Sequence, residues 1–139
     1  MKSLLIKVIC VLIVLGAILI SIPTRQKNDG NEVVFWTLQM NDFAPYMNKV
    51  IKEFEVQNPE IKIKWVDVPF SEGEKRTLAS VLSDNPPDLI NLNPDFSALL
   101  AQRGALYEIQ PEYTKQFNKS IINSLKYNGK LYSLPWYAT

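Results

Sequence analysis

The spacing of hydrophobic residues predicts strands and helices that alternate along the chain. The run Val33-Val34-Phe35-Trp36-Thr37 is continuous, β-branched and aromatic, which is typical of a strand buried on both faces of a parallel sheet. We expect Asn41 or Asp42 to cap the helix that follows and Asn58-Pro59 to end it. The apolar residues of that helix recur on one face, at Phe43, Tyr46, Met47, Val50, Ile51 and Phe54.

Two later segments predict strands on either side of the first one. Residues 61–66 alternate apolar side chains with lysines, which indicates a strand near the sheet edge with one wetter face. Residues 88–92, which include Leu89, Ile90 and Leu92, predict a shorter third strand after a helical pattern at Leu78, Val81 and Leu82. Right-handed crossovers between such units give a mostly parallel α/β sheet flanked by helices, with the first strand in the middle.

The C-terminal part of the chain predicts two helices and a hairpin. Asn93 followed by Pro94 is an N-cap with proline in the first helical position. Asn128-Gly129 is a strong two-residue hairpin turn, and the segment after it leads into Trp136. Between them, Pro111 can open a last helix with apolar residues four apart, at Tyr113, Phe117, Ile121 and Leu125.

The N-terminal segment is the most apolar part of the chain. Val8 to Ile22 carries no charge, and with Leu4 to Ile6 it approaches the roughly 20 residues that cross a bilayer. Two interpretations stay open for residues 1–22, a cleaved signal peptide and an uncleaved membrane anchor. Both export the remainder of the chain, and residues 23–31 then form a polar linker.

The composition offers little for catalysis or metal binding. The chain has no histidine, and its single cysteine, Cys10, lies inside the N-terminal apolar run. The exported part therefore lacks the usual proton-transfer group at neutral pH and the usual metal ligands, so we expect no enzyme activity, cofactor or metal site. The formal net charge is +1 and there are no basic runs, which argues against nucleic acid as a partner.

Residues near the ends of the predicted strands are better candidates for a binding site. Sugars present an apolar ring face and a rim of hydroxyls, so their sites combine aromatic planes with amides and carboxylates. Several candidates also have a structural interpretation: Trp36 and Trp136 as core residues, Asp42 as a helix cap and Asp95 as a first-turn charge. The candidate substrate-binding residues are Trp36, Gln39, Asn41, Asp42, Asn93, Asp95, Trp136 and Tyr137.

Three motifs in this order resemble the extracellular sugar-binding proteins of ABC importers, maltodextrin-binding proteins included. They are VVFWT with the helix ending EFEVQNPEIKIKW, then NPPDLINLNPDFSALLAQRGAL, then YNGKLYSLPWYAT. The resemblance implies a periplasmic-binding-protein-like (type II) fold, in which two lobes clamp a sugar. It also implies ligand contacts from residues 36–42, 91–95 and 136–139, although Phe96 stands where some members have arginine.

The resemblance further implies that residues 32–139 form the N-terminal lobe of such a protein, and we expect this lobe to be truncated. The expected function is capture of a carbohydrate outside the membrane and its delivery to ABC permease subunits. The expected location is the periplasm or the outer face of the bacterial cytoplasmic membrane. The alternative is a membrane-anchored interaction module, or a fragment without solute binding. A secreted hydrolase fits least, because the chain has neither histidine nor a nucleophile motif.

Overall fold

The structure is a computed structural model that describes residues 30–136 of the chain. The expected signal or anchor of residues 1–22, the linker up to residue 29, and Tyr137 lie outside the described residues. Within residues 30–136, no helix is both long enough and apolar enough to span a membrane.

Three parallel strands form the central sheet, in the order β2-β1-β3. Strand β1 (Glu32–Leu38) pairs with β2 (Lys62–Val68) along its whole length. It pairs with the short β3 (Leu89–Ile90) on its other side, at Phe35 and Trp36. The prediction that the first strand lies between the second and the third is therefore confirmed.

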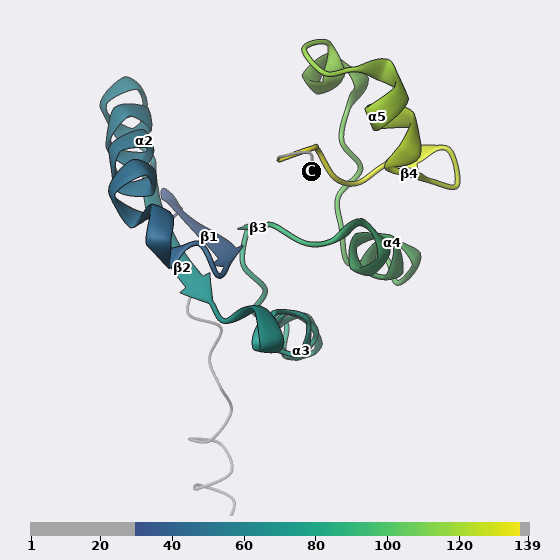
Figure 1. Cartoon of the computed structure of the whole chain (residues 1–139), viewed down its shortest axis with the longest axis horizontal. Helices are drawn as coiled ribbons and strands as arrows, with labels where there is room; N and C mark the ends of the chain where they lie inside the picture. Colours follow the sequence, from purple (N-terminus) through teal and green to yellow (C-terminus); the bar gives the residue numbers. More distant parts are fainter. Residues whose placement is uncertain (1–29, 137–139) are drawn as a thin grey trace, which may run out of the picture.

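Helices α2 (Ala44–Gln57) and α3 (Phe70–Leu82) cover opposite faces of this sheet, as Figure 1 shows. Leu38 faces α3, because a Cβ atom added at Gly73 would lie 2.6 Å from Leu38 Cδ2. Successive side chains of a strand point to opposite faces. Trp36 therefore lies on the same face as Leu38, whereas Phe35 and Thr37 lie on the face away from α3.

Strand β1 is less buried than its sequence predicts. Thr37 is buried, and the other six residues of the strand are half-buried, because α2 and α3 each cover only part of a face. The expectation of a strand buried on both faces is therefore wrong in degree. Buried apolar side chains lie at Met47 and Val68, on α2 and β2, and in a second group on α4, α5 and β5: Phe96, Leu100, Ala101, Ile122 and Leu131.

Neither Asn41 nor Asp42 caps α2, so this expectation is wrong. Both residues lie in a 3-10 turn, η1 (Asn41–Phe43), and the N-cap of α2 is Phe43, without a side-chain hydrogen bond. The turn closes when Phe43 N donates to the Met40 carbonyl at 2.9 Å. The side chains of Asn41 and Asp42 are exposed on the loop.

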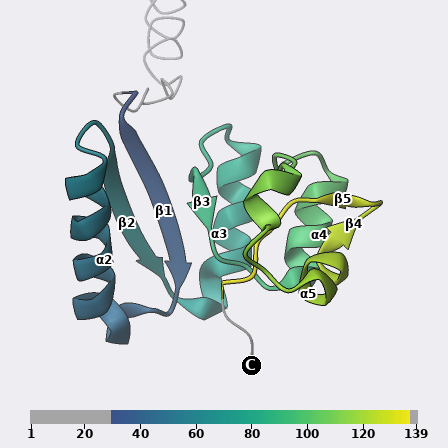
Figure 2. The same ribbon diagram turned by 90° about the horizontal axis from the view of Figure 1, so that it is seen from above.

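The remaining elements pack on the far side of β3 from β1 (Figure 2). The hairpin prediction is confirmed, because Asn128 and Gly129 have φ of 48° and 77°, as a two-residue turn of this kind requires. The prediction of one helix from Pro111 onwards is wrong, because Asn118 accepts a hydrogen bond from Ser120 N and starts a new helix. These elements are α4 (Pro94–Gln102), η2 (Pro111–Thr114), α5 (Lys119–Ser124), β4 (Lys126–Tyr127) and β5 (Lys130–Leu131).

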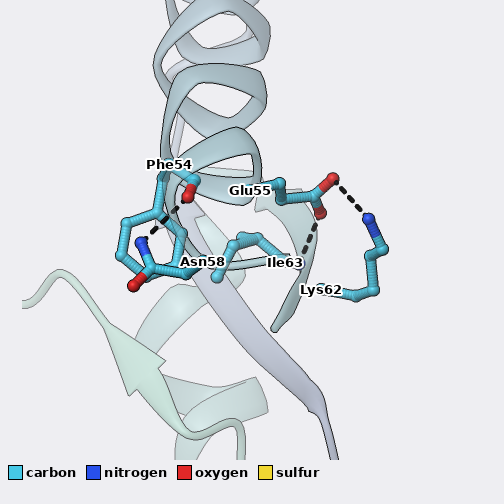
Figure 3. A network of polar contacts seen from close by, with 5 residues as sticks. All are labelled: Phe54, Glu55, Asn58, Lys62 and Ile63. Atoms are coloured by element: carbon cyan, nitrogen blue, oxygen red, sulfur yellow. Dashed lines mark hydrogen bonds and ion pairs between the residues drawn. The ribbon is translucent and has the colours of Figure 1, made fainter. Parts of the chain in front are cut away.

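A side chain from α2 covers the outer edge of β2 (Figure 3). Glu55 Oε1 accepts from Ile63 N at 2.8 Å, and Oε2 accepts from Lys62 Nζ at 3.3 Å. The bond from the Ile63 N–H lowers the pKa of Glu55, with smaller help from Lys62 and some opposition from desolvation. An uncovered N–H on an edge strand can pair with another chain, so Glu55 blunts this edge.

Candidate functional site

The carboxyl ends of the three parallel strands lie at one edge of the sheet. The loops at this edge are residues 39–43 after β1, Pro69 after β2 and residues 91–93 after β3 (Figure 2). In open parallel sheets, ligands bind beyond this edge of the strands. Five of the eight predicted site residues lie here: Gln39, Asn41, Asp42, Asn93 and Asp95.

The loop after β1 presents three of these side chains together. Gln39, Asn41 and Asp42 are all exposed, and Gln39 has a left-handed φ of 54°. The backbone is tied to the neighbouring strand, because Gln39 N donates to the Val68 carbonyl at 2.9 Å. The loop thus places two amides and one carboxylate at the sheet edge on a fixed backbone.

The start of α4 supplies the second group of polar side chains. Asn93 Oδ1 accepts from Phe96 N at 2.8 Å, which confirms the predicted N-cap, and Asn93 Nδ2 donates to Glu74 Oε1 at 2.7 Å. Asp95 is exposed in the first turn, where the helix dipole favours a negative charge. An open hollow of about 340 Å³ joins these residues, lined by Glu74, Asn93, Asp95, Phe96 and Leu99.

A second hollow lies between α4 and the hairpin. It has a volume of about 130 Å³, and Asp95 lines it together with Tyr127 and Tyr132. Sequence reasoning did not single out these tyrosines, nor Glu74. The Asn128-Gly129 turn was a signal that could have found the tyrosines, because a tight hairpin brings the residues shortly before and after it close together.

The two predicted tryptophans do not lie on the same face of the sheet. The ring centroids of Trp136 and Phe35 are 5.4 Å apart and the planes are tilted by 55°, so Trp136 packs on the face away from α3. Trp36 follows Phe35 in the strand and lies on the α3 face, where it is half-buried. The two indoles therefore do not form one aromatic wall, and 51% of Trp136 remains exposed. Tyr137 lies outside the described residues.

The chemistry of this edge is that of hydrogen bonding. Among residues 30–136, no group of three or more histidine, cysteine or acidic side chains is placed to hold a metal ion. In the same part of the chain, every buried side-chain nitrogen and oxygen has a hydrogen-bond partner. The exposed amides of Gln39 and Asn41 offer donors and acceptors, and the carboxylates of Asp42 and Asp95 offer strong acceptors. Such a set suits a ligand rich in hydroxyl groups.

Comparison with known proteins gives consistent matches. A family model described as bacterial extracellular solute-binding protein matches residues 39–139. The multiple sugar-binding protein of Streptococcus mutans is 30% identical over 116 residues, which cover 81% of this chain and 27% of that protein. A maltodextrin-binding protein of Bacillus subtilis is 25% identical over 108 residues, which cover 78% of this chain and 25% of that protein.

A solved structure shows the same fold. The ABC substrate-binding protein of Listeria monocytogenes in complex with cycloalternan superposes with a TM-score of 0.62 at 25% identity, over 72% of this chain and 27% of that one. The fold expectation, a type II periplasmic-binding-protein lobe with a mostly parallel sheet, is thereby confirmed. This chain spans about a quarter of the length of the relatives it matches.

Proposed function

The chain belongs to the family of bacterial extracellular solute-binding proteins, and from this premise we propose that it serves as the ligand-binding component of an ABC importer for a carbohydrate. In this role it captures the sugar outside the membrane and delivers it to permease subunits. It acts by binding and release, not as an enzyme, and nucleic acid is no partner. Residues 32–139 act as the first lobe, and residues 1–22 act as a signal peptide or anchor ahead of a linker at residues 23–31.

The observation that carries the proposal is the cluster of exposed amides and carboxylates at the carboxyl edge of the sheet. The loop at Gln39–Asp42 and the first turn of α4 at Asp95 both face solvent at this edge. Sugar hydroxyls both donate and accept hydrogen bonds, and paired amides and carboxylates match them. The names of the two relatives, a multiple sugar-binding protein and a maltodextrin-binding protein, support a carbohydrate over other solutes.

Trp136 is the better placed of the two tryptophans to stack on a sugar ring. About half of its surface is exposed, and its contact with Phe35 fixes the ring on the face away from α3. Trp36 is half-buried on the opposite face of the sheet. In this proposal Trp136, with its neighbour Tyr137, supplies the aromatic surface on which a sugar ring stacks. Trp36 has a structural role within β1.

A titration followed by nuclear magnetic resonance tests the proposal, because this method detects the millimolar affinity expected of a single wall of a pocket. The ¹⁵N-labelled chain is titrated with maltotriose, with a mannose trisaccharide, and with glutamine as a control solute. We expect shift changes at residues 39–42 and 93–95 with a sugar and none with glutamine. Asp42→Ala should weaken the sugar response, whereas Glu53→Ala on the exposed surface of α2 should not.

Two outcomes would contradict the proposal. A response to glutamine at residues 39–42, with no response to either sugar, would replace the carbohydrate by another solute class. Sugar-induced shifts confined to residues far from the sheet edge would remove the site. In either case the family assignment would stand, since it depends on the match over residues 39–139.

One observation favours a second candidate, a membrane-anchored interaction module without a solute of its own. Helix α2 and the turn before it expose four large apolar side chains at helical spacing: Phe43 from η1, and Tyr46, Val50 and Phe54 from α2. A stripe of this kind can bind a protein partner. Capture of a defined partner that Val50→Lys abolishes, together with no sugar response, would favour this candidate over the first.

A further inference from the structure

The loop after β1 has a conformation that its sequence does not favour by itself. Gln39 has a φ of 54°, a left-handed value that a residue with a Cβ rarely adopts. Strand β2 and the loop after β3 supply acceptors for three successive N–H groups around it. Leu38 N donates to Asn91 Oδ1 at 2.8 Å, Gln39 N to the Val68 carbonyl at 2.9 Å, and Met40 N to Asp67 Oδ1 at 2.8 Å.

The bond to Asp67 is the end of a longer chain of side-chain hydrogen bonds. Trp65 Nε1 donates to Thr37 Oγ1 at 2.7 Å, and Thr37 Oγ1 donates to Asp67 Oδ1 at 2.7 Å. The direction is fixed, because an indole N–H can only donate and an ionised carboxylate can only accept. Thr37 is fully buried, so water does not compete for its hydroxyl group. One oxygen of Asp67 therefore links the sheet interior to the loop.

The geometry of β2 explains why Asp67 reaches the loop. Asp67 is the register partner of Thr37, so the two side chains lie side by side on the face away from α3. The strand ends one residue later, and β1 turns at Gln39 next to this carboxylate. Aspartate has a low strand propensity, but at this position of β2 the Asp67 carboxylate accepts two hydrogen bonds, from Thr37 and from Met40.

We propose that Asp67 is a positioning residue for ligand binding, which holds the loop Gln39–Asp42 in the conformation that presents its side chains at the sheet edge. The inference rests on the proposed carbohydrate site. In this proposal Asp67 acts through Thr37 and Met40, which both donate to its Oδ1, and not through a contact with the ligand. A pre-organised loop loses less conformational entropy on binding, so loss of Asp67 weakens affinity without removing any direct contact.

Three variants test the side-chain oxygen of Asp67: one removes it, one keeps it, and one removes the corresponding acceptor of Asp88 instead. Asp67→Ala removes the acceptor, whereas Asp67→Asn keeps an oxygen that can accept from both partners. Asp88→Ala is the matched control, because Asp88 Oδ2 accepts from Val34 N of the same strand β1 at 2.7 Å, away from the loop. The full chain is used throughout, in a non-glycosidic detergent on account of its apolar N-terminal segment.

The first measurement is amide hydrogen exchange without ligand. Asp67→Ala should raise exchange at Met40 about tenfold through loss of the hydrogen bond, and Asp67→Asn, which keeps a neutral acceptor, should raise it less. Asp88→Ala should change exchange at Val34 and leave Met40 unaltered. If Asp67→Ala fails to fold, Thr37→Val, which keeps the side-chain shape without the hydroxyl, should still raise exchange at Met40.

The second measurement is the maltotriose titration. Asp67→Ala should weaken binding about tenfold, Asp67→Asn should restore most of it, and Asp88→Ala should bind like the wild type. Unaltered exchange at Met40 in the folded variants would overturn the inference whether or not a sugar binds. Altered exchange at Met40 with unaltered sugar affinity would overturn the inference about Asp67 and leave the proposed function standing. If the wild type binds no sugar, the proposed function fails, and a change at Met40 would then leave Asp67 a purely structural residue.

Discussion

The close approach of α3 to β1 at Gly73 yields a prediction that can be worked out quantitatively. A Cβ atom added at Gly73 would lie 2.6 Å from Leu38 Cδ2, 2.9 Å from Cδ1 and 3.3 Å from Cγ. The two shortest distances, both under 3.0 Å, are to the methyl groups of Leu38. Gly73→Ala therefore forces the Leu38 side chain to change its conformation.

Two effects of Gly73→Ala oppose each other. Within a helix, alanine is more favourable than glycine by about 1 kcal/mol. Overpacking against Leu38 costs about 1–3 kcal/mol. In the wild-type background the substitution should thus lower the free energy of unfolding by about 0–2 kcal/mol. In a Leu38→Ala background the clash is absent, and the same substitution should raise that free energy by about 1 kcal/mol.

A double-mutant cycle separates these effects. The four chains, wild type, both single variants and the double variant, are unfolded in urea and followed by tryptophan fluorescence. The expected coupling energy is about 1–3 kcal/mol, the size of the steric penalty. If Gly73→Ala has the same effect in both backgrounds, α3 does not approach β1 at this point, and the assignment of Leu38 and Trp36 to the α3 face is wrong.

Three further substitutions test other local features. The lowered pKa of Glu55 means that its bond to the Ile63 N–H stabilises the fold above pH 4.5 and is lost as pH falls through the lowered value. Glu55→Gln should therefore flatten the stability profile on the acid side in urea titrations, and an unchanged profile would argue against the edge bond. Asn93→Ala should lower the free energy of unfolding by about 1 kcal/mol through loss of the α4 cap, unless the Phe96 N–H finds another acceptor. Gly129→Ala should lower it by about 1–2 kcal/mol, because φ is 77° there, and equal melting temperatures would contradict the turn geometry.

The sequence predicts the order of the elements and the sheet well, because both depend on hydrophobic period and on crossover handedness. The position of β1 between β2 and β3 and the hairpin at Asn128-Gly129 follow from such local signals. The length of β3 does not follow from local signals. The strand covers only Leu89–Ile90, because the side chains of Asp88 and Asn91 take the β1 N–H groups on either side of it.

The candidate site is predicted only in part. The polar residues of the loop after β1 and of the start of α4 lie where the strand ends predicted them. The face of each aromatic residue could not be predicted, since Phe35 and Trp36 are adjacent and nothing in the sequence indicates which of them contacts Trp136. The acceptor role of Asp67 could not be predicted either, because it depends on the strand register, which pairs Asp67 with Thr37.

The contact between Phe35 and Trp136 has a consequence for how the chain acquires its structure. It joins the first strand to the last described residue, so closing it requires almost the whole described chain to be in place. Contacts between residues so distant in sequence slow folding, since the entropy of loop closure precedes any gain from packing. On the ribosome, the Phe35 ring would lack this contact until synthesis had passed Trp136, and apolar surface exposed during that interval can be bound by chaperones.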